Sequence, residues 1–310
     1  MMRLHKVKKS KQLANIFSQI FTLSLTKTFI FLLVVIGINL FKDFTPEAMT
    51  PRGSRKANAQ LKHQQKKDKS KFLPFFDNSN NPVPVAFPPG EILDISPKAP
   101  QLNSFDRAVL KVCGPIGSPV STEKFQKLLS YYPDVVRKLQ KVTNGEIQPG
   151  RRVKSDFIQD LTNIWFDRKG FEHIFCGEIY NENDIGGLHF YGRYLELQNL
   201  GIGGRLPNNV KKQEVVPGII YTMGVVIKQK DGTLVKDVIK GYGYLSNAEE
   251  ILLDVTQIYK LQGKNEGACI YRVKDKDTGK SFPTVFVRKN RAIITYYPDA
   301  TPSGKNCNAS

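Results

Sequence analysis

The sequence predicts an α+β fold, in which helices come first and a mostly antiparallel sheet follows. Two observations support this prediction. Apolar residues recur at helical spacing in three early stretches, at 122–132, 133–142 and 155–166. After Gly170 the pattern changes to short strand-like runs separated by turn signals, at 221–228, 233–239, 282–288 and 292–297, with one helical stretch at 247–259 between them.

The N-terminal part resembles a targeting segment. Residues 1–27 form a basic region, and residues 28–41 form an uninterrupted apolar run of 14 residues. A spanning helix needs roughly 20 residues, which the preceding mixed apolar residues would supply. A cleaved signal peptide, an uncleaved anchor and a buried helix of a soluble domain are all compatible with this pattern. We expect an uncleaved anchor, with the rest of the chain outside the cytoplasm. A buried helix is the less favoured interpretation, because buried helices rarely follow so basic a leader.

Residues 42–104 are expected to form a linker. They are polar, basic and rich in Asn and Pro, a composition that does not support a packed core. The first 71 residues hold 15 of the 46 Lys and Arg residues but only 3 of the 28 acidic residues, so most of the net charge of +18 lies there. Such a tail suits phosphate backbones or anionic membrane surfaces, or is a solvated arm. The folded domain is expected to span 105–310.

The four cysteines are Cys113, Cys176, Cys269 and Cys307. No CxxC pair indicates a zinc ribbon or a redox motif. Their even number allows disulfides in an oxidising compartment, and the sequence does not choose among the possible pairings.

Only two of the four histidines, His173 and His189, fall within the expected domain. A strand, a polar turn and a Gly-Gly loop between them would bring the imidazoles to one cleft. Because histidine titrates near neutrality, one of a pair can remove a proton while the other supplies one. Cleavage of RNA by its own 2′-hydroxyl needs that division of work.

Other interpretations of these residues are open. Both histidines are compatible with ordinary hydrogen-bonded positions in a half-buried sheet. A zinc site of His173, Cys176, Glu178 and His189 would need a bulge, because His173 and Cys176 face opposite sides of a regular strand. The run 201–204 is a weak phosphate-loop candidate and fits a turn better.

Four motifs in order resemble the EndoU endoribonucleases, a family that includes a frog enzyme and a coronaviral uridylate-specific endoribonuclease. The first motif is the run 170–178 around His173, and the second is Gly187-Leu188-His189. A lysine precedes a helix start at 246–250, and Thr295-Tyr296-Tyr297-Pro298 closes the series. The resemblance covers roughly residues 105–298.

The resemblance implies two sheet-bearing lobes flanking a basic groove, and RNA cleavage that leaves 2′,3′-cyclic phosphate ends. It implies that His173 and His189 are the acid-base pair, with His189 as the base. The third catalytic residue would be Lys236, which we prefer to Lys240 on the distance to the helix start. Both lysines are expected on the same face of one strand.

The remaining family positions concern support and base recognition. Glu172 and Glu178 match acidic positions that orient an imidazole or support a strand. Thr295 and Tyr297 match the residues that bind uracil, whereas Lys240 stands where a serine is frequent. We therefore expect cleavage at pyrimidines, with uridine favoured over cytidine less sharply than with the serine. Cys176 replaces an aliphatic residue and is expected to be a buried free thiol.

The expected partner is RNA, together with a membrane through the N-terminal segment. No cofactor is expected for the chemical step, and Mn²⁺ is considered only as an aid to RNA binding. A catalytically inactive RNA-binding module on the same fold is the main alternative, and a surface-anchored structural protein is another.

Overall fold

A computed structural model describes residues 72–77, 85–86, 92–93, 96–207, 209 and 214–307. All of them belong to the second of two units into which the chain divides, residues 60–310. Within the described residues no helix is both long and apolar enough to cross a membrane. The basic region 1–27 and the apolar run 28–41 lie outside the described residues.

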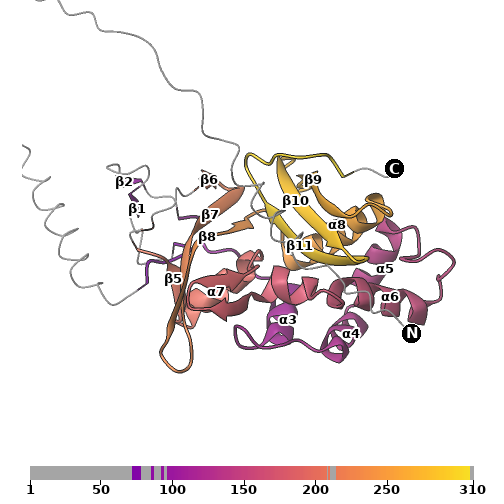
Figure 1. The fold of residues 1–310 in the computed structure, drawn as a ribbon, viewed down its shortest axis with the longest axis horizontal. Helices are drawn as coiled ribbons and strands as arrows, with labels where there is room; N and C mark the ends of the chain where they lie inside the picture. The colour runs from indigo at the N-terminus through magenta and orange to yellow at the C-terminus, as the bar shows by residue number, and fades with distance from the viewer. Residues whose placement is uncertain are drawn as a thin grey trace, which may run out of the picture. The chain divides into compact units, whose positions relative to one another are not determined.

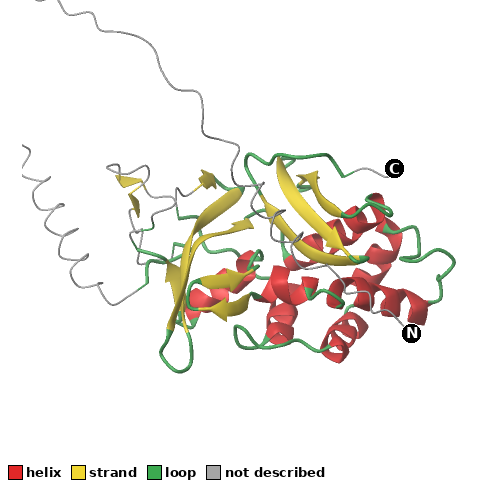
Figure 2. Ribbon diagram, viewed as in Figure 1, coloured by secondary structure: helices red, strands yellow, loops and turns green. Residues whose placement is uncertain are grey.

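The helices that precede the sheets confirm the predicted helical stretches and add one. They are α3 (Ser104–Cys113), α4 (Thr122–Tyr131), α5 (Pro133–Val142) and α6 (Lys154–Phe166). Helix α3 was not predicted as a separate helix, although it begins with a capping box between Asn103 and Asp106. In the view of Figures 1 and 2, α3, α4 and α6 lie below the sheet that is formed by the last three strands of the chain.

The strands form two larger antiparallel sheets and two small ones. The first large sheet contains β5 (Gly203–Arg205), β6 (Glu214–Val216), β7 (Ile220–Lys228) and β8 (Leu234–Gly243), with β7 central. The second has the order β11-β10-β9, from β9 (Gly267–Lys274), β10 (Ser281–Lys289) and β11 (Ala292–Pro298). The small pairs are β3 (Glu178–Asn181) with β4 (Asp184–Gly186), and β1 (Val85–Ala86) with β2 (Ile92–Leu93). This arrangement confirms the α+β class.

The sequence predicted one helix among the strands, and the structure has two in its described part. Helix α8 (Ala248–Leu261) is the predicted one and begins with an Asn247–Glu250 capping box. Helix α7 (Tyr191–Asn199) was missed; its N-cap Phe190 and its first residue Tyr191 are aromatic, so its start resembles a strand in sequence. Strand β9 was also missed.

One core joins the helices to both sheets. Trp165 of α6 is fully buried, packs against Phe171 and Phe175, and donates its indole N–H to Thr256 Oγ1 of α8 at 3.1 Å. Helix α6 also packs on β11, and α8 packs on β10. The segment that carries His173 therefore lies directly on the core.

The folded part of the chain extends further toward the N-terminus than the expected boundary at 105. Phe75 and Phe76 are completely buried, and their amide N–H groups both donate to Gln198 Oε1, at 2.6 and 2.9 Å. Phe75 also contacts the Tyr194 ring edge-on. Two adjacent aromatic residues thus dock a short piece of the expected 42–104 linker on α7, because burying them removes a large apolar area from water.

Candidate active site

A glycine loop brings His173 and His189 together. The N–H of Leu188 donates to the His173 carbonyl at 2.8 Å, and the N–H of His189 donates to the Ile174 carbonyl at 2.9 Å. Between the histidines Gly187 has a φ of 63°, and a Cβ there would lie 1.7 Å from the His173 carbonyl oxygen. Only glycine fits this approach. The two imidazole centroids are 5.7 Å apart.

His173 lies on a π-helical turn, η1 (Glu172–Cys176), and the strand expected there was wrong. Gly177, at a φ of 77°, ends this turn so that β3 can begin. The five-residue turn aims His173 at the carboxylate of Glu178: His173 Nδ1 and Glu178 Oε2 are 2.8 Å apart. A carboxylate in this contact accepts, so Nδ1 carries the proton and Nε2 is left for a ligand.

Glu178 is held in its ionised form. Burial would raise its pKa, but hydrogen bonds from His173 and from Tyr180, whose hydroxyl donates at 2.6 Å, leave the pKa below its ordinary value. The carboxylate is therefore negative at neutral pH and can pair with a protonated His173. Glu178 thus contacts an imidazole, which is one of the two roles that the resemblance implied for it.

His189 has a different environment. Its Nδ1 lies 3.0 Å from the carbonyl oxygen of Gly241, which can only accept, so Nδ1 carries the proton and Nε2 holds a free lone pair. Burial, the neighbouring His173 and then Lys240 lower the pKa of His189 to about 3. His189 is therefore neutral at physiological pH and can accept a proton.

Lys240, and not Lys236, lies with the histidines. Lys240 lines the same cavity as His173 and His189, whereas Lys236 is exposed outside it. The expectation that the two lysines share a face was wrong. Lys240 pairs with Met223 of β7, but Lys236 pairs with Val226, so β8 holds one extra residue between these pairs. That bulge reverses the alternation of side chains and turns the two lysines to opposite faces.

Asp237 stabilises this bulge and was not recognised from the sequence. Its Oδ2 lies 2.9 Å from Lys240 Nζ and accepts the N–H of Ile185 at 3.2 Å, while its Oδ1 accepts the N–H of Ile239 at 3.0 Å. In a regular strand, residues three apart point to opposite faces, so the sequence gives no sign that Asp237 and Lys240 form a pair.

The second sheet supplies the other wall of the cavity through Thr295 and Tyr297 of β11. The Tyr297 ring lies 5.5 Å from the His189 ring at 35°. The hydroxyl oxygen of Thr295 is buried and has no hydrogen-bond partner among the described residues. The cavity measures about 430 Å³ and is also lined by Tyr180, Asp184, Ile185, Gly186, Gly187, Thr222, Ile239, Gly241, Pro298 and Asp299.

Glu172 supports the backbone and does not line this cavity. It is buried, and its Oε1 accepts the N–H of Val120 at 3.0 Å, which fixes the loop before α4 to η1. Cys176, at the end of the same turn, was expected to be a free thiol. That expectation was wrong, because Cys176 forms a disulfide with Cys113 of α3. A second disulfide joins Cys269 to Cys307.

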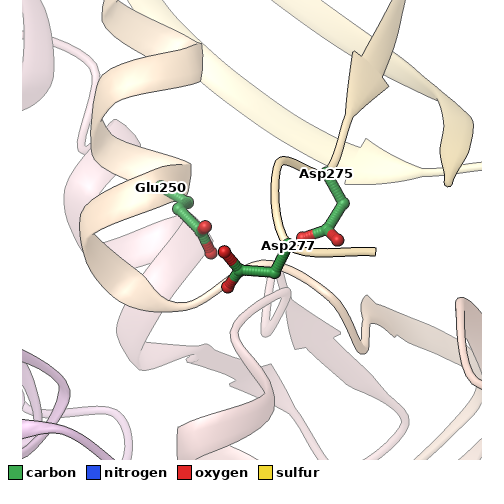
Figure 3. Close-up of side chains that lie close together, drawn as sticks. All are labelled: Glu250, Asp275 and Asp277. Carbon is green, nitrogen blue, oxygen red and sulfur yellow. The ribbon is translucent and has the colours of Figure 1, made fainter. Parts of the chain in front are cut away.

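Among the described residues, one cluster of carboxylates lies away from this cavity. The disulfide removes Cys176 from the zinc set considered above, because a metal requires the thiolate. Elsewhere, ligand oxygens of Glu250, Asp275 and Asp277 lie within 4.8 Å of one another, as Figure 3 shows. Hard oxygen donors of this kind suit Mg²⁺, Ca²⁺ or Mn²⁺, and none of the three residues lines the cavity.

Comparisons with known proteins place these residues within one family model. Residues 167–300 match the model described as bacterial EndoU nuclease. No curated protein sequence matches the chain.

Two solved structures are similar at low identity. One is XendoU, described as a splicing-independent snoRNA-processing endoribonuclease, with a TM-score of 0.46, 16% identity, and coverage of 78% of this chain and 96% of that one. The other is the endoribonuclease Nsp15 of Middle East Respiratory Syndrome Coronavirus, with a TM-score of 0.32, 14% identity, and coverage of 46% of this chain and 37% of that one.

Proposed function

We propose, from the premise that residues 167–300 are an EndoU nuclease domain, that this protein is an endoribonuclease that cleaves single-stranded RNA. The observation that carries the proposal is the complementary hydrogen bonding of two neighbouring imidazoles. His189 donates to a carbonyl and is neutral, whereas His173 donates to an ionised carboxylate. One ring is thus prepared to accept a proton and the other to carry a positive charge.

The proposed reaction is transesterification. Nε2 of His189 takes the proton of the 2′-hydroxyl, and the 2′-oxygen forms a bond to phosphorus. The bond from phosphorus to the 5′-oxygen breaks, and His173, protonated and paired with Glu178, gives a proton to that oxygen. Lys240 provides positive charge beside the phosphate as negative charge develops. The products are a 2′,3′-cyclic phosphate end and a 5′-hydroxyl end.

We propose that the base beside the cleaved bond is a pyrimidine, preferably uracil. Tyr297 offers a ring face next to His189, and base stacking on an aromatic ring is worth roughly 1 to 3 kcal/mol. The unpartnered Thr295 hydroxyl can both donate to a carbonyl and accept from an N–H. Lys240 contacts Asp237 and lies near His189, so we assign it to the phosphate and not to the base.

We also propose that the domain acts outside the cytoplasm. The support is the pair of disulfides, which form and persist in oxidising compartments. The apolar run 28–41 remains our proposed anchor, and Mn²⁺ our proposed aid to RNA binding.

The test is incubation of the purified protein with RNA that contains all four bases, followed by analysis of the ends. We expect cyclic phosphate ends after uridine and, less often, cytidine. Alanine at His173 or His189 should reduce the rate by on the order of 100- to 10,000-fold. Alanine at His63, a histidine outside residues 167–300, is the matched control. Intact RNA retained in a complex with wild type would favour the inactive RNA-binding module instead.

A further inference from the structure

A second basic concavity lies between α3 and α4, apart from the candidate active site. It measures about 650 Å³, and its aliphatic lining residues are Ala108, Val112 and Leu128. Its other lining residues are Lys111, Lys124, Lys127, Tyr131 and Tyr132. We call it the α3–α4 groove. No residue of the candidate active site lines it, and no acidic residue does.

The lysines of this groove are free to bind an anion. Lys111, Lys124 and Lys127 are exposed, and no ion pair between described residues involves any of them. By contrast, Lys138 of the neighbouring α5 is paired with Glu249. The groove is therefore a local excess of positive charge on the described surface.

The groove also presents an aromatic ring to solvent. Tyr131 is 70% exposed, the largest value among the exposed large hydrophobic residues of the described chain. Lys124, Lys127 and Tyr131 follow one another at intervals of three and four residues, so they share one face of α4. Lys127 Nζ lies 5.9 Å from the Tyr131 ring centroid. An exposed ring beside unpaired cations supplies the two contacts that a nucleotide needs, one for the base and one for the phosphate.

We propose that the α3–α4 groove is a second binding surface for single-stranded RNA, which holds the part of the substrate that extends beyond the active site. This inference rests on the proposed function. Charge complementarity argues for the occupant: an RNA chain with one nucleotide in the active-site cavity continues past it as a polyanion.

The groove has a rigid connection to the catalytic segment. Helix α3 packs against η1, and the Cys113–Cys176 disulfide joins the two directly. Arg193, which is buried, donates to the carbonyls of Gly114 and Cys176, the residues at this junction. RNA held by α3 and α4 is therefore held at a fixed position relative to His173.

The binding experiment uses the full chain with His173→Ala and His189→Ala, so that RNA is not cleaved. Binding of a fluorescent twenty-nucleotide RNA is measured across a series of salt concentrations, with and without Lys111→Ala, Lys124→Ala and Lys127→Ala together. We expect the three changes to weaken binding and to reduce the slope of log K against log salt by about 2, since each phosphate contact contributes about 0.7. Lys264→Ala, Lys274→Ala and Lys289→Ala together remove the same charge from other exposed positions and are the matched control.

The cleavage experiment uses the same lysine changes in the chain with both histidines. We expect KM for the twenty-nucleotide RNA to rise relative to the control triple variant, while kcat and the cleavage of a tetranucleotide stay unchanged. Because all three lysines are exposed, the melting temperature should not change.

Two outcomes would overturn the inference. One is equal RNA affinity and equal salt slope in the groove and control variants. The other is unchanged RNA binding combined with lost binding to phosphatidylserine-containing vesicles, which would assign the groove to a membrane surface. If the wild-type protein cleaves neither the twenty-nucleotide RNA nor the tetranucleotide, the proposed function fails. The binding comparison still tests whether the groove binds RNA.

Discussion

The two histidines differ in what their Nδ1 atoms contact, and the proposed acid and base roles rest on this difference. The carbonyl of Gly241 stabilises the tautomer of His189 with a free Nε2 lone pair, without supplying negative charge. The carboxylate of Glu178 supplies that charge to His173. The resemblance alone gave His189 the role of base, and these hydrogen bonds now support that role on physical grounds.

The two lysines of β8 provide a sharp test at the same scale. We expect Lys240→Ala to lower kcat/KM by on the order of 100- to 1,000-fold, the range for removing one preorganised electrostatic contact. Lys236→Ala should stay near wild type, because Lys236 is exposed outside the cavity. Asp237→Asn should lose part of the activity, because it removes the ion pair that holds Lys240. Steady-state kinetics on one RNA measures all three, and a larger loss in Lys236→Ala would restore the original assignment.

The sequence identified most residues around the cavity but not how they are held there. His173, His189, Glu178, Thr295 and Tyr297 lie where the motifs imply, because each motif places its residue on a local element. The motifs did not show which of the two lysines faces the cavity, because this depends on strand register, which is set by pairing with β7.

Among the elements, the amphipathic helices were predictable and the irregular turns were not. Helices α4, α5 and α6 follow the predicted stretches closely, since apolar spacing and capping are local signals. The π-helical turn η1 and the β8 bulge have no local signal. Each exists because of a contact with a distant part of the chain, η1 with the glycine loop and the bulge with β4.

Helix α8 should make the stability of the domain depend on pH through Asp254. Burial, and then the neighbouring Glu250, raise the pKa of Asp254 to about 7, with Lys276 acting in the opposite direction. The folded-state pKa is above the unfolded value near 3.8, so the stability present at low pH is lost as pH rises from about 4 to 7. Asp254→Asn should therefore stabilise the protein at pH 8, by up to about 4 kcal/mol at roughly 1.4 kcal/mol per pKa unit.

Denaturant unfolding of Asp254→Asn at pH 5 and pH 8 checks this expectation. The gain at pH 5 should be less than half of the gain at pH 8, because at pH 5 Asp254 is protonated in the folded state but already ionised in the unfolded state. Asp231→Asn, at an exposed turn, is the control and should show no comparable difference. Equal effects of Asp254→Asn at both pH values would contradict the assignment.

At the scale of the whole molecule, the two disulfides close loops of comparable length in different parts of the fold. Cys113 and Cys176 are 63 residues apart, and Cys269 and Cys307 are 38 apart. By loop entropy each contributes about 4 kcal/mol to the free energy of unfolding. Only the first lies beside the catalytic segment, since Cys176 ends η1 and Cys269 belongs to β9.

We expect the paired serine variants to separate stability from catalysis. Both pairs should lower the unfolding free energy by about 2 to 5 kcal/mol. Cys113→Ser with Cys176→Ser should also lower kcat at temperatures where the variant is still folded, because η1 loses its tie to α3. Cys269→Ser with Cys307→Ser should keep kcat. Equal loss of kcat in the two pairs, measured well below both unfolding transitions, would show that neither disulfide supports the site specifically.

The cavity is built from distant parts of the chain. His173 comes from η1, His189 from the loop between β4 and α7, and Lys240 from β8, whereas β11 provides Thr295 and Tyr297. A premature stop codon before β11 would therefore leave a product with both histidines and the lysine, but with an open cavity and no ring beside His189. Such a fragment would also lose the β10–β11 pairing that covers the core above α6. We therefore expect truncations before β11 to abolish nuclease activity completely. Partial copies of the gene that lack β11 should not encode even a weakened nuclease.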